Sequence, residues 1–144
     1  IGEKIDVINY VLMEATNIVP YIHGANRLGV LVTLNNAPNE ANAACGKDVA
    51  MQIAAMAPVS LDKSDVPQEI IDSELEIGRE LARKEGKPEN MIDKIAQGKL
   101  NKFYAESTLI NQEYIRDSKK TVGQYIADID KDLKITGFKR IALG

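Results

Sequence analysis

Hydrophobic residues recur every three or four positions in two neighbouring stretches in the middle of the chain. They are Ile70, Ile71, Leu75, Gly78, Leu81 and Ala82 in the first stretch, and Met91, Ile92, Ile95, Ala96, Leu100 and Phe103 in the second. Charged residues fill most of the positions between them. This spacing predicts two amphipathic helices, the first over residues 68–85.

The residues between the two stretches predict how the helices are joined. Gly86 suits the left-handed position just past a helix end, and Pro88 suits the first turn of a following helix. Helices joined by so short a turn are expected to lie antiparallel. Because the apolar stripes are thin and the rest is charged, we expect a coiled-coil hairpin over about residues 67–106 that projects from a globular body. An ordinary helical hairpin inside a bundle is the alternative.

The remaining chain predicts strands on both sides of an alanine-rich helix. Residues 4–15, 18–23, 29–34 and 134–143 are rich in strand-forming residues, and their short spacing near the start favours antiparallel pairing. Pro20 marks an edge strand or a bulge. The helix is expected over residues 40–57 and carries four candidate core residues on one face. These are Cys45, Val49, Ile53 and Met56.

Two capping patterns predict further helix starts. Asp65 and Gln68 form a plausible capping box for the first arm of the hairpin, and Thr121 and Gln124 form another that opens a helix through about Asp130. Between them, residues 107–120 are irregular, with a short strand at 108–110.

These elements predict an α+β fold: a small three- to four-stranded antiparallel sheet, helices packed on one face, and the projecting hairpin. The whole of residues 1–144 is expected to form one domain, because the length fits a single core.

Composition and charge exclude several classes of function. With 44% hydrophobic and 27% charged residues the chain resembles a globular protein, and no apolar run is long enough for a membrane span. Cys45 is the one cysteine, which excludes an internal disulfide and fits a reducing cytoplasm. The net charge of −3 argues against a dedicated nucleic-acid binder. Neither a membrane nor a nucleic acid is therefore expected as a partner.

Candidate catalytic chemistry is nearly absent. His23 is the one histidine, so a multi-histidine metal site is excluded, and no phosphate-binding glycine pattern occurs. A Cys45–His23 nucleophile–base pair is disfavoured because Cys45 falls on an apolar helix face. No catalytic residue, metal or cofactor is expected. For His23 itself, an ordinary turn residue and a partner contact both remain open.

Basic residues follow the hairpin with aromatic residues among them. They are Lys99, Lys102, Arg116, Lys119 and Lys120, with Phe103, Tyr104 and Tyr114. RNA binding is conceivable on such a surface, but a solvated surface or a protein contact is favoured.

Several segments, in a fixed order along the chain, carry a family signature. They are Tyr21-Ile22-His23-Gly24, Arg27-Leu28-Gly29-Val30-Leu31-Val32, Asp48-Val49-Ala50-Met51-Gln52-Ile53-Ala54-Ala55, Gly86-Lys87-Pro88-Glu89-Asn90-Met91-Ile92-Asp93-Lys94-Ile95, Gly98-Lys99-Leu100-Asn101-Lys102-Phe103-Tyr104 and Lys119-Lys120-Thr121-Val122-Gly123-Gln124. Together they resemble elongation factor Ts, and the resemblance covers nearly the whole chain.

This resemblance implies a role in translation. Elongation factor Ts binds elongation factor Tu and promotes release of GDP without covalent chemistry. The chain is similar to the C-terminal half of the family's core, which is expected to touch the third domain of elongation factor Tu, and whose sheet supports dimerisation in some members. The resemblance implies partner contacts at His23, Gly24 and Arg27. It gives a weaker indication for the hairpin tip, Gly86, Lys87 and Pro88.

The chain also departs from the family's pattern. It lacks the ubiquitin-associated-like module and the Thr-Asp-Phe-Val segment that is thought to disturb the partner's magnesium site. Gln52 stands where many members have histidine, and Gln112-Glu113-Tyr114 replaces a Gln-Pro-Phe pattern. The alternative function is therefore a structural dimerisation module, through the sheet or the hairpin, with no exchange activity of its own.

Overall fold

An antiparallel sheet of three strands lies at the centre of the body. The computed structural model describes residues 17–24, 27–36 and 39–142. Within them, β1 (Asn17–His23), β2 (Leu28–Leu34) and β5 (Ile135–Ala142) form the sheet in the order β1-β2-β5. The predicted antiparallel pairing is confirmed, and Pro20 does lie on an edge strand. The strand predicted at residues 4–15, the middle of the β1–β2 turn and Leu143 lie outside the described residues.

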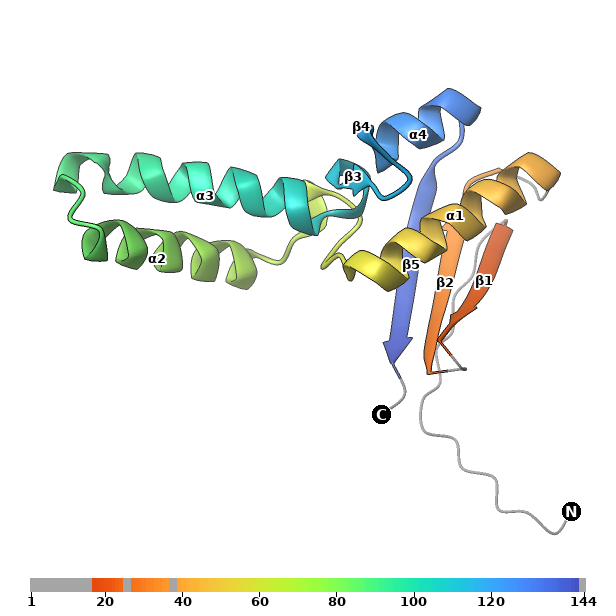
Figure 1. Ribbon diagram of the computed structural model, residues 1–144, viewed down its shortest axis with the longest axis horizontal. Helices are drawn as coiled ribbons and strands as arrows, with labels where there is room; N and C mark the ends of the chain where they lie inside the picture. The colour runs from red at the N-terminus through yellow and green to blue at the C-terminus, as the bar shows by residue number, and fades with distance from the viewer. Residues whose placement is uncertain (1–16, 25–26, 37–38, 143–144) are drawn as a thin grey trace, which may run out of the picture.

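One face of the sheet forms the core. In the register of the strands, Val19 lies opposite Val32, which lies opposite Phe138, so these three side chains share a face. Helix α1 (Glu40–Met56) crosses this face (Figure 1). Helix α4 (Val122–Ile129) adds Val122 and Ile126 to the same hydrophobic cluster. The expected packing of helices on one face of the sheet is therefore confirmed.

Helix α1 presents its predicted face to the sheet along most of its length. Cys45, Val49 and Ile53 are fully buried. The expectation for Met56 is wrong, since its side chain is 48% exposed. Met56 is the last residue of the helix, and the chain turns away at Ala57, which has a left-handed φ of 45°. Its side chain therefore lies beyond the sheet that covers the earlier turns.

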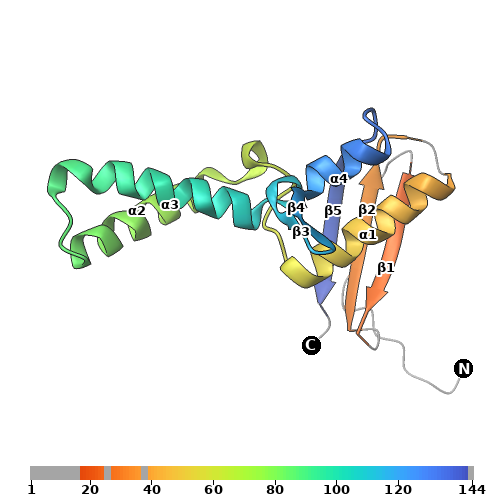
Figure 2. The same ribbon diagram turned by 45° about the horizontal axis from the view of Figure 1, so that its top comes forward.

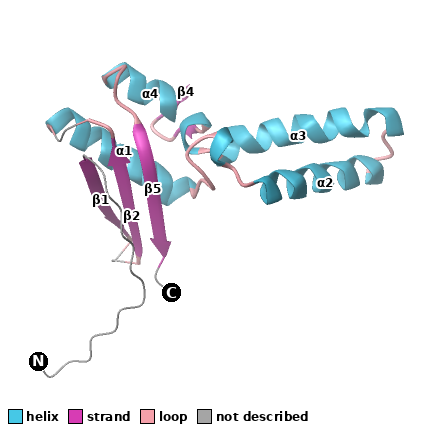
Figure 3. Cartoon of the chain, turned by 180° about the vertical axis from the view of Figure 1, so that it is seen from behind, coloured by secondary structure: helices cyan, strands magenta, loops and turns pink. Residues whose placement is uncertain are grey.

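Helices α2 (Gln68–Lys84) and α3 (Ile92–Ser107) form an antiparallel hairpin that projects from the body (Figures 1 and 3). A short 3-10 turn, η2 (Glu89–Met91), joins the tip to α3. The buried residues of the two helices form a thin seam. They are Gly78, Ala82, Ile92, Ala96 and Leu100. The two backbones are close, because a Cβ added at Gly78 would stand 3.0 Å from the Cα of Ala96. The predicted coiled-coil-like hairpin is present.

The two segments that connect the hairpin to the body run side by side. The amide of Val59 donates to the carbonyl of Ser107 at 2.8 Å, and the amide of Leu109 donates to the carbonyl of Ser60 at 2.9 Å. Ser60 and Thr108 form a parallel β-bridge. These bonds close the base of the hairpin, so it is attached to the body through paired backbone and not through a single loop.

The strand predicted at residues 108–110 is wrong. Residues Leu109–Asn111 form a 3-10 turn, η3, because the carbonyl of Thr108 accepts from the amides of Asn111 and Gln112. The side chains that suggested a strand therefore belong to a turn, and one of them, Leu109, is fully buried in the core of the body.

Two short strands that the sequence did not predict follow this turn. They are β3 (Glu113–Tyr114) and β4 (Asp117–Thr121), and they form a separate two-stranded sheet. The capping box at the start of α4 is confirmed: the amide of Gln124 donates to the hydroxyl of Thr121, and the amide of Thr121 donates to the side chain of Gln124. The helix ends at Ile129, one residue before the predicted limit.

The capping box expected at Asp65 and Gln68 is wrong. Asp65 instead accepts from the amide of Asp62, and together they cap the 3-10 turn η1 (Lys63–Asp65). Pro67 precedes α2 with no side-chain cap, since the turn at residues 62–65 has already taken the carboxylate. None of the described helices has the length and apolar character that a membrane crossing requires.

Candidate partner-binding surfaces

The turn between β1 and β2 places His23, Gly24 and Arg27 at one end of the sheet. Gly24 has a φ of +60°, a conformation that residues with side chains rarely adopt, and nothing stands near the position of a Cβ there. The amide of Arg27 donates to the carbonyl of Gly24 at 3.1 Å, which closes the turn. His23, Gly24 and Arg27 are all exposed. The three residues therefore form one accessible group on a framework of paired strands.

The orientation of His23 is set by its neighbour on the same strand face. The hydroxyl of Tyr21 lies 3.0 Å from Nδ1 of His23, and the two rings are 5.9 Å apart. When Tyr21 donates this bond, the proton of the neutral imidazole is on Nε2, where it can be donated to a partner. Tyr21 also packs against the body's core. It therefore links the exposed imidazole to the rigid part of the fold.

An apolar side chain accompanies the polar residues of the turn. Ile22 is 61% exposed and points to the face of the sheet opposite α1, as does Ile18. The turn thus offers a hydrogen-bond donor, a guanidinium and an apolar contact at neighbouring positions. Such a mixture suits recognition of a protein surface.

The hairpin tip is built by a regular helix-ending motif. The amide of Gly86 donates to the carbonyl of Arg83, and the amide of Lys87 donates to the carbonyl of Ala82, both at 3.0 Å. With Gly86 at a φ of +72°, this is the Schellman arrangement, and it confirms the predicted role of the glycine. Pro88 has a φ of −58° and leads into η2. All three tip residues are exposed.

The two groups of candidate residues lie far apart. The hairpin tip is at one extreme of the molecule, and the β1–β2 turn is at the end of the sheet near the C-terminus (Figures 1 and 2). One small partner domain would not reach both, so the turn and the tip are two separate surfaces.

The Cys45–His23 pair is not assembled. Cys45 is fully buried under the sheet, and burial, followed by the nearby charge of Asp48, raises the pKa of its thiol to about 11. His23 lies on the exposed turn and contacts Tyr21 instead. A thiol held neutral in the core acts as a small hydrophobic residue. Across the described residues, no group of three His, Cys, Asp or Glu side chains is placed to hold a metal ion.

The basic residues after the hairpin are largely engaged with carboxylates. Arg116 pairs with Asp48 at 3.1 Å, and Lys120 pairs with Asp128 at 2.6 Å. Tyr114 is buried and stacks on Tyr125, with ring centroids 4.2 Å apart. Arg116 and Lys120 therefore each have a carboxylate partner, and the ring of Tyr114 is enclosed by the body.

Sequence reasoning missed a buried polar centre. Gln52 is fully buried, and its Nε2 donates to Oε1 of Gln112 and to the carbonyl of Glu113, at 3.3 and 2.9 Å. Its Oε1 accepts from the amide of Ile115 at 2.9 Å. The sequence contained a signal for this centre, because Gln52 lies one turn from Val49 on the core side of α1. An amide side chain buried there requires hydrogen-bond partners. Gln52, which departs from the family pattern, thus contacts Gln112, where the chain keeps the glutamine of that pattern, and the backbone of Glu113.

Comparison with known proteins agrees with the sequence signature. The family model "Elongation factor TS" matches residues 1–144. The chain is 50% identical over 143 residues to elongation factor Ts of Cytophaga hutchinsonii, covering 99% of this chain and 51% of that protein. It is 48% identical to the protein of Amoebophilus asiaticus, covering 99% of this chain and 52% of the relative. It is 46% identical to that of a Hydrogenobaculum species, covering 100% of this chain and 50% of the relative.

The chain spans about half the length of these curated relatives. Similarity at this level, over all of the chain, identifies the family without reference to any single residue. The chain belongs to the elongation factor Ts family.

Proposed function

We infer that this chain is a guanine-nucleotide exchange-factor domain that binds elongation factor Tu and promotes release of GDP. The observation that carries the proposal is the exposed β1–β2 turn, in which His23 is oriented by Tyr21 on the sheet of a member of this family. The relatives of this chain are named as translation elongation factors. Elongation factor Tu as the partner, and the exchange of its nucleotide, belong to the proposal.

The mechanism follows from linkage between two binding events. A protein that binds the nucleotide-free conformation of its partner more tightly than the GDP-bound one lowers the partner's affinity for GDP by the same factor. This requires a surface with a fixed shape, because a flexible surface would fit both conformations. The strands at both ends of the turn supply a fixed framework, since they are paired over seven positions.

The roles of the residues follow from their contacts. When the hydroxyl of Tyr21 donates to Nδ1 of His23, the Nε2–H of the imidazole is available as a donor to the partner. Arg27 supplies a positive charge beside it, and Gly24 permits the tight turn that brings the two together. By the order of its motifs, the chain corresponds to the C-terminal half of the family's core, and residues 1–144 act as one domain.

A second candidate function is a dimerisation module without exchange activity. The observation that favours it is the exposed apolar face of the sheet opposite α1, which carries Ile18 and Ile22. A strictly monomeric mass in solution would count against this candidate.

The test is release of a fluorescent GDP from elongation factor Tu, with and without this chain, with binding followed in parallel. We expect His23→Ala and Arg27→Ala each to weaken binding by roughly tenfold, as for a central interface residue. Tyr21→Phe keeps the ring and removes only the hydroxyl, so a loss of about threefold is expected from a less well oriented imidazole. Gln97→Ala, at an exposed position on the hairpin, is the matched control.

The outcomes separate the candidates. Faster release means that this half alone shifts the partner's conformation. Binding without faster release makes the chain a docking half. No detectable binding at about 100 µM, a concentration that still captures weak protein contacts, contradicts the proposal.

A further inference from the structure

Strand β5 has a free edge. Within the described residues it pairs with β2 alone, and residues 137–142 lie in unbroken register with that strand. Of the three strands in the sheet, β5 is the one nearest the hairpin (Figure 3). Every second residue of an edge strand turns its backbone amide and carbonyl away from the sheet. These groups of β5 are therefore available to pair with a further strand.

A groove follows this edge. One cavity, of about 390 Å³, lies between the segment at residues 58–61 and residues 137–140 of β5. A second cavity, of about 460 Å³, lies beside the start of the strand, at Ile135. Leu61 and Asp65 line both cavities, so the two adjoin and together follow β5 from Ile135 to Arg140.

The wall of the groove opposite β5 belongs to the paired base of the hairpin. The amide of Ile110 donates to the carbonyl of Leu61 at 3.1 Å, in addition to the bonds at Val59 and Ser60. The segment at residues 59–61 is therefore held by backbone hydrogen bonds, and the groove has a fixed wall on each side.

Four cations line these cavities, on β5 and on the turn that precedes it. They are Lys131, Lys134, Lys139 and Arg140. All four are exposed, and within the described part of the chain none of them forms an ion pair with a carboxylate. Arg140 makes one bond, from Nη2 to the carbonyl of Ala54 at 3.4 Å, which leaves most of its donors free.

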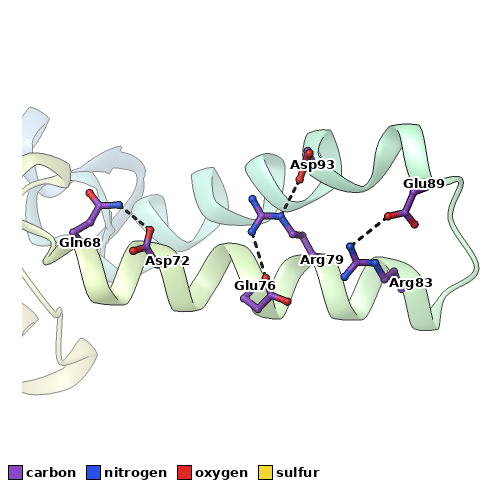
Figure 4. A network of polar contacts seen from close by, with 7 residues as sticks. All are labelled: Gln68, Asp72, Glu76, Arg79, Arg83, Glu89 and Asp93. Atoms are coloured by element: carbon purple, nitrogen blue, oxygen red, sulfur yellow. Dashed lines mark hydrogen bonds and ion pairs between the residues drawn. The ribbon is translucent and has the colours of Figure 1, made fainter.

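The arginines of the hairpin are different. Arg79 bonds to Asp93 at 2.8 Å and to Glu76 at 3.4 Å. Arg83 bonds to Glu89 at 3.3 Å, and Figure 4 shows these pairs following one another toward the tip. A partner of the hairpin would have to compete with these pairs, whereas carboxylates placed beside β5 would meet cations that have none.

The carboxylates on the opposite wall of the groove already have donors. Asp62 accepts from the amide of Lys63 and from the side chain of Asn111, at 2.7 and 2.9 Å. Asp65 accepts from the amide of Asp62 at 3.2 Å. The charge in the groove is thus positive beside β5 and negative beside η1, and the positive side is the one without partners.

Apolar side chains lie among the cations. Phe138 is half-buried and Val59 is 48% exposed, and both line the smaller cavity. Phe138 and Arg140 point to the α1 side of the sheet, and Lys139, between them, points to the other side. A strand paired with β5 would therefore place its neighbouring residues beside an apolar ring and two cations in turn.

We propose that the edge of β5 binds an extended acidic segment of a partner protein, which adds an antiparallel fourth strand to the sheet. Opposite Arg140, Lys139 and Phe138 in turn, this strand carries two carboxylates and then an apolar residue. Backbone hydrogen bonds to residues 137–142 hold it, and the side-chain pairs select its sequence. A second copy of this chain is a poor occupant, because its own β5 would bring the same cations into the groove.

This surface is separate from the β1–β2 turn. Strand β1 forms the opposite edge of the sheet, and neither His23 nor Arg27 lines the groove. We expect His23→Ala to leave peptide binding unchanged, and Lys139→Glu to leave GDP release from elongation factor Tu unchanged. Failure of either proposal therefore leaves the other one standing.

The first test is fluorescence anisotropy of a labelled peptide, Val-Glu-Asp-Ile-Thr-Glu-Leu, whose second, third and fourth residues are placed for Arg140, Lys139 and Phe138. We expect a dissociation constant below about 100 µM. Lys139→Glu should raise it by at least roughly tenfold, because the substitution replaces attraction by repulsion. Lys94→Glu is the matched control, since Lys94 is also exposed but lies on α3.

Backbone pairing has readouts of its own. The same peptide, N-methylated at alternate residues, should bind at least roughly tenfold more weakly in one phase of methylation and normally in the other, since only one set of its amides faces β5. The bound peptide should also slow hydrogen exchange at alternate amides of residues 137–142. Exchange in α2 and α3 should not change.

Several results overturn the proposal. The first is no detectable binding at about 1 mM peptide. The second is equal binding of a scrambled peptide, or equal binding of both methylated forms, because charge alone would then explain the attraction. The third is protection of the β5 amides that grows with the concentration of the chain alone, which would assign the edge to a second copy.

Discussion

The body and the hairpin hold themselves together in different ways. In the body, large side chains from separate elements are fully buried together, as with Val32 of β2, Ile53 of α1 and Leu109 of η3. In the hairpin, the seam relies on small residues, Gly78 and Ala96, that let two backbones approach. The same helical periodicity therefore serves two kinds of packing. In one, stability comes from apolar volume, and in the other it comes from close contact over a narrow strip.

This difference predicts where a substitution acts. Loss of volume in the body removes contacts from several elements at once and lowers the stability of the whole. A disturbance in the seam separates two helices that touch little else, so its effect stays local.

The largest effect is expected from Ile53→Ala. Ile53 of α1 is fully buried in the core of the body, and its truncation leaves a cavity. We expect the free energy of unfolding to fall by about 2–5 kcal/mol, measured by urea denaturation. A loss below about 1 kcal/mol would mean that the body relaxes around the cavity, and that the contrast with the hairpin is smaller than the packing indicates.

A smaller, local effect is expected from Gly78→Val. Its Cβ would press on the backbone of Ala96, which cannot rotate away, so the helices must separate. We expect a cost of about 1–3 kcal/mol, with faster hydrogen exchange in α2 and α3 and unchanged exchange in the sheet. Faster exchange throughout the body would show instead that the two regions unfold together.

The control for this variant is Gly98→Ala. Gly98 also lies inside a hairpin helix, but nothing stands within 4 Å of the position of a Cβ there. Alanine should therefore stabilise α3 by up to about 1 kcal/mol, through helix propensity alone.

The smallest effect concerns Cys45 and appears as a pH dependence. Burial, with a contribution from Asp48, raises the pKa of the folded thiol to about 11, from 9.0 in its ordinary state. A raised pKa means that the folded state holds its proton longer than the unfolded state. The corresponding stability is complete below pH 9 and is lost as the pH rises toward 11.

Urea denaturation at a series of pH values measures this slope, and Cys45→Ala should remove the part that belongs to the thiol. Cys45→Ser should leave binding to elongation factor Tu unchanged if the thiol has no chemical role. Rapid reaction of the native thiol with Ellman's reagent near pH 8 would contradict the buried, neutral state.

Sequence patterns correctly predicted those elements whose structure is decided by residues close to them in the sequence. The seam of the hairpin, the Gly86 ending and the Thr121 cap were all readable, because each depends on residues within one or two helical turns. The β1–β2 turn was recognised from its residues, and the hydrogen bond from Tyr21 is a short-range consequence of strand alternation.

The missed features depend on contacts between distant segments. Residues 113–121 form two short strands next to α1, where Gln52 bonds to Glu113 and Ile115 across more than 60 positions. Met56 continues the apolar period of α1 but passes the end of the sheet. Periodicity says which residues could be buried, and the extent of the opposite surface decides which ones are.

The contact between Gln52 and Gln112 joins one departure from the family pattern, Gln52, to a position where the chain keeps the glutamine of that pattern. Seen along the chain they are independent, since 60 positions separate them. In the fold they share one buried network, so a substitution at either position is expected to depend on the residue at the other.

The paired segments at the base of the hairpin have a topological consequence. The chain leaves the body at Val59 and returns at Ser107, and a single backbone hydrogen bond of 2.8 Å joins these two points. The body's own hydrogen bond therefore holds the two ends of the intervening loop together. The entropic cost of closing that loop depends only weakly on its length. The hairpin is in this sense an interchangeable insert: a tight turn between residues 59 and 107 would complete the body's chain, and a different antiparallel pair of helices could be spliced into the same opening.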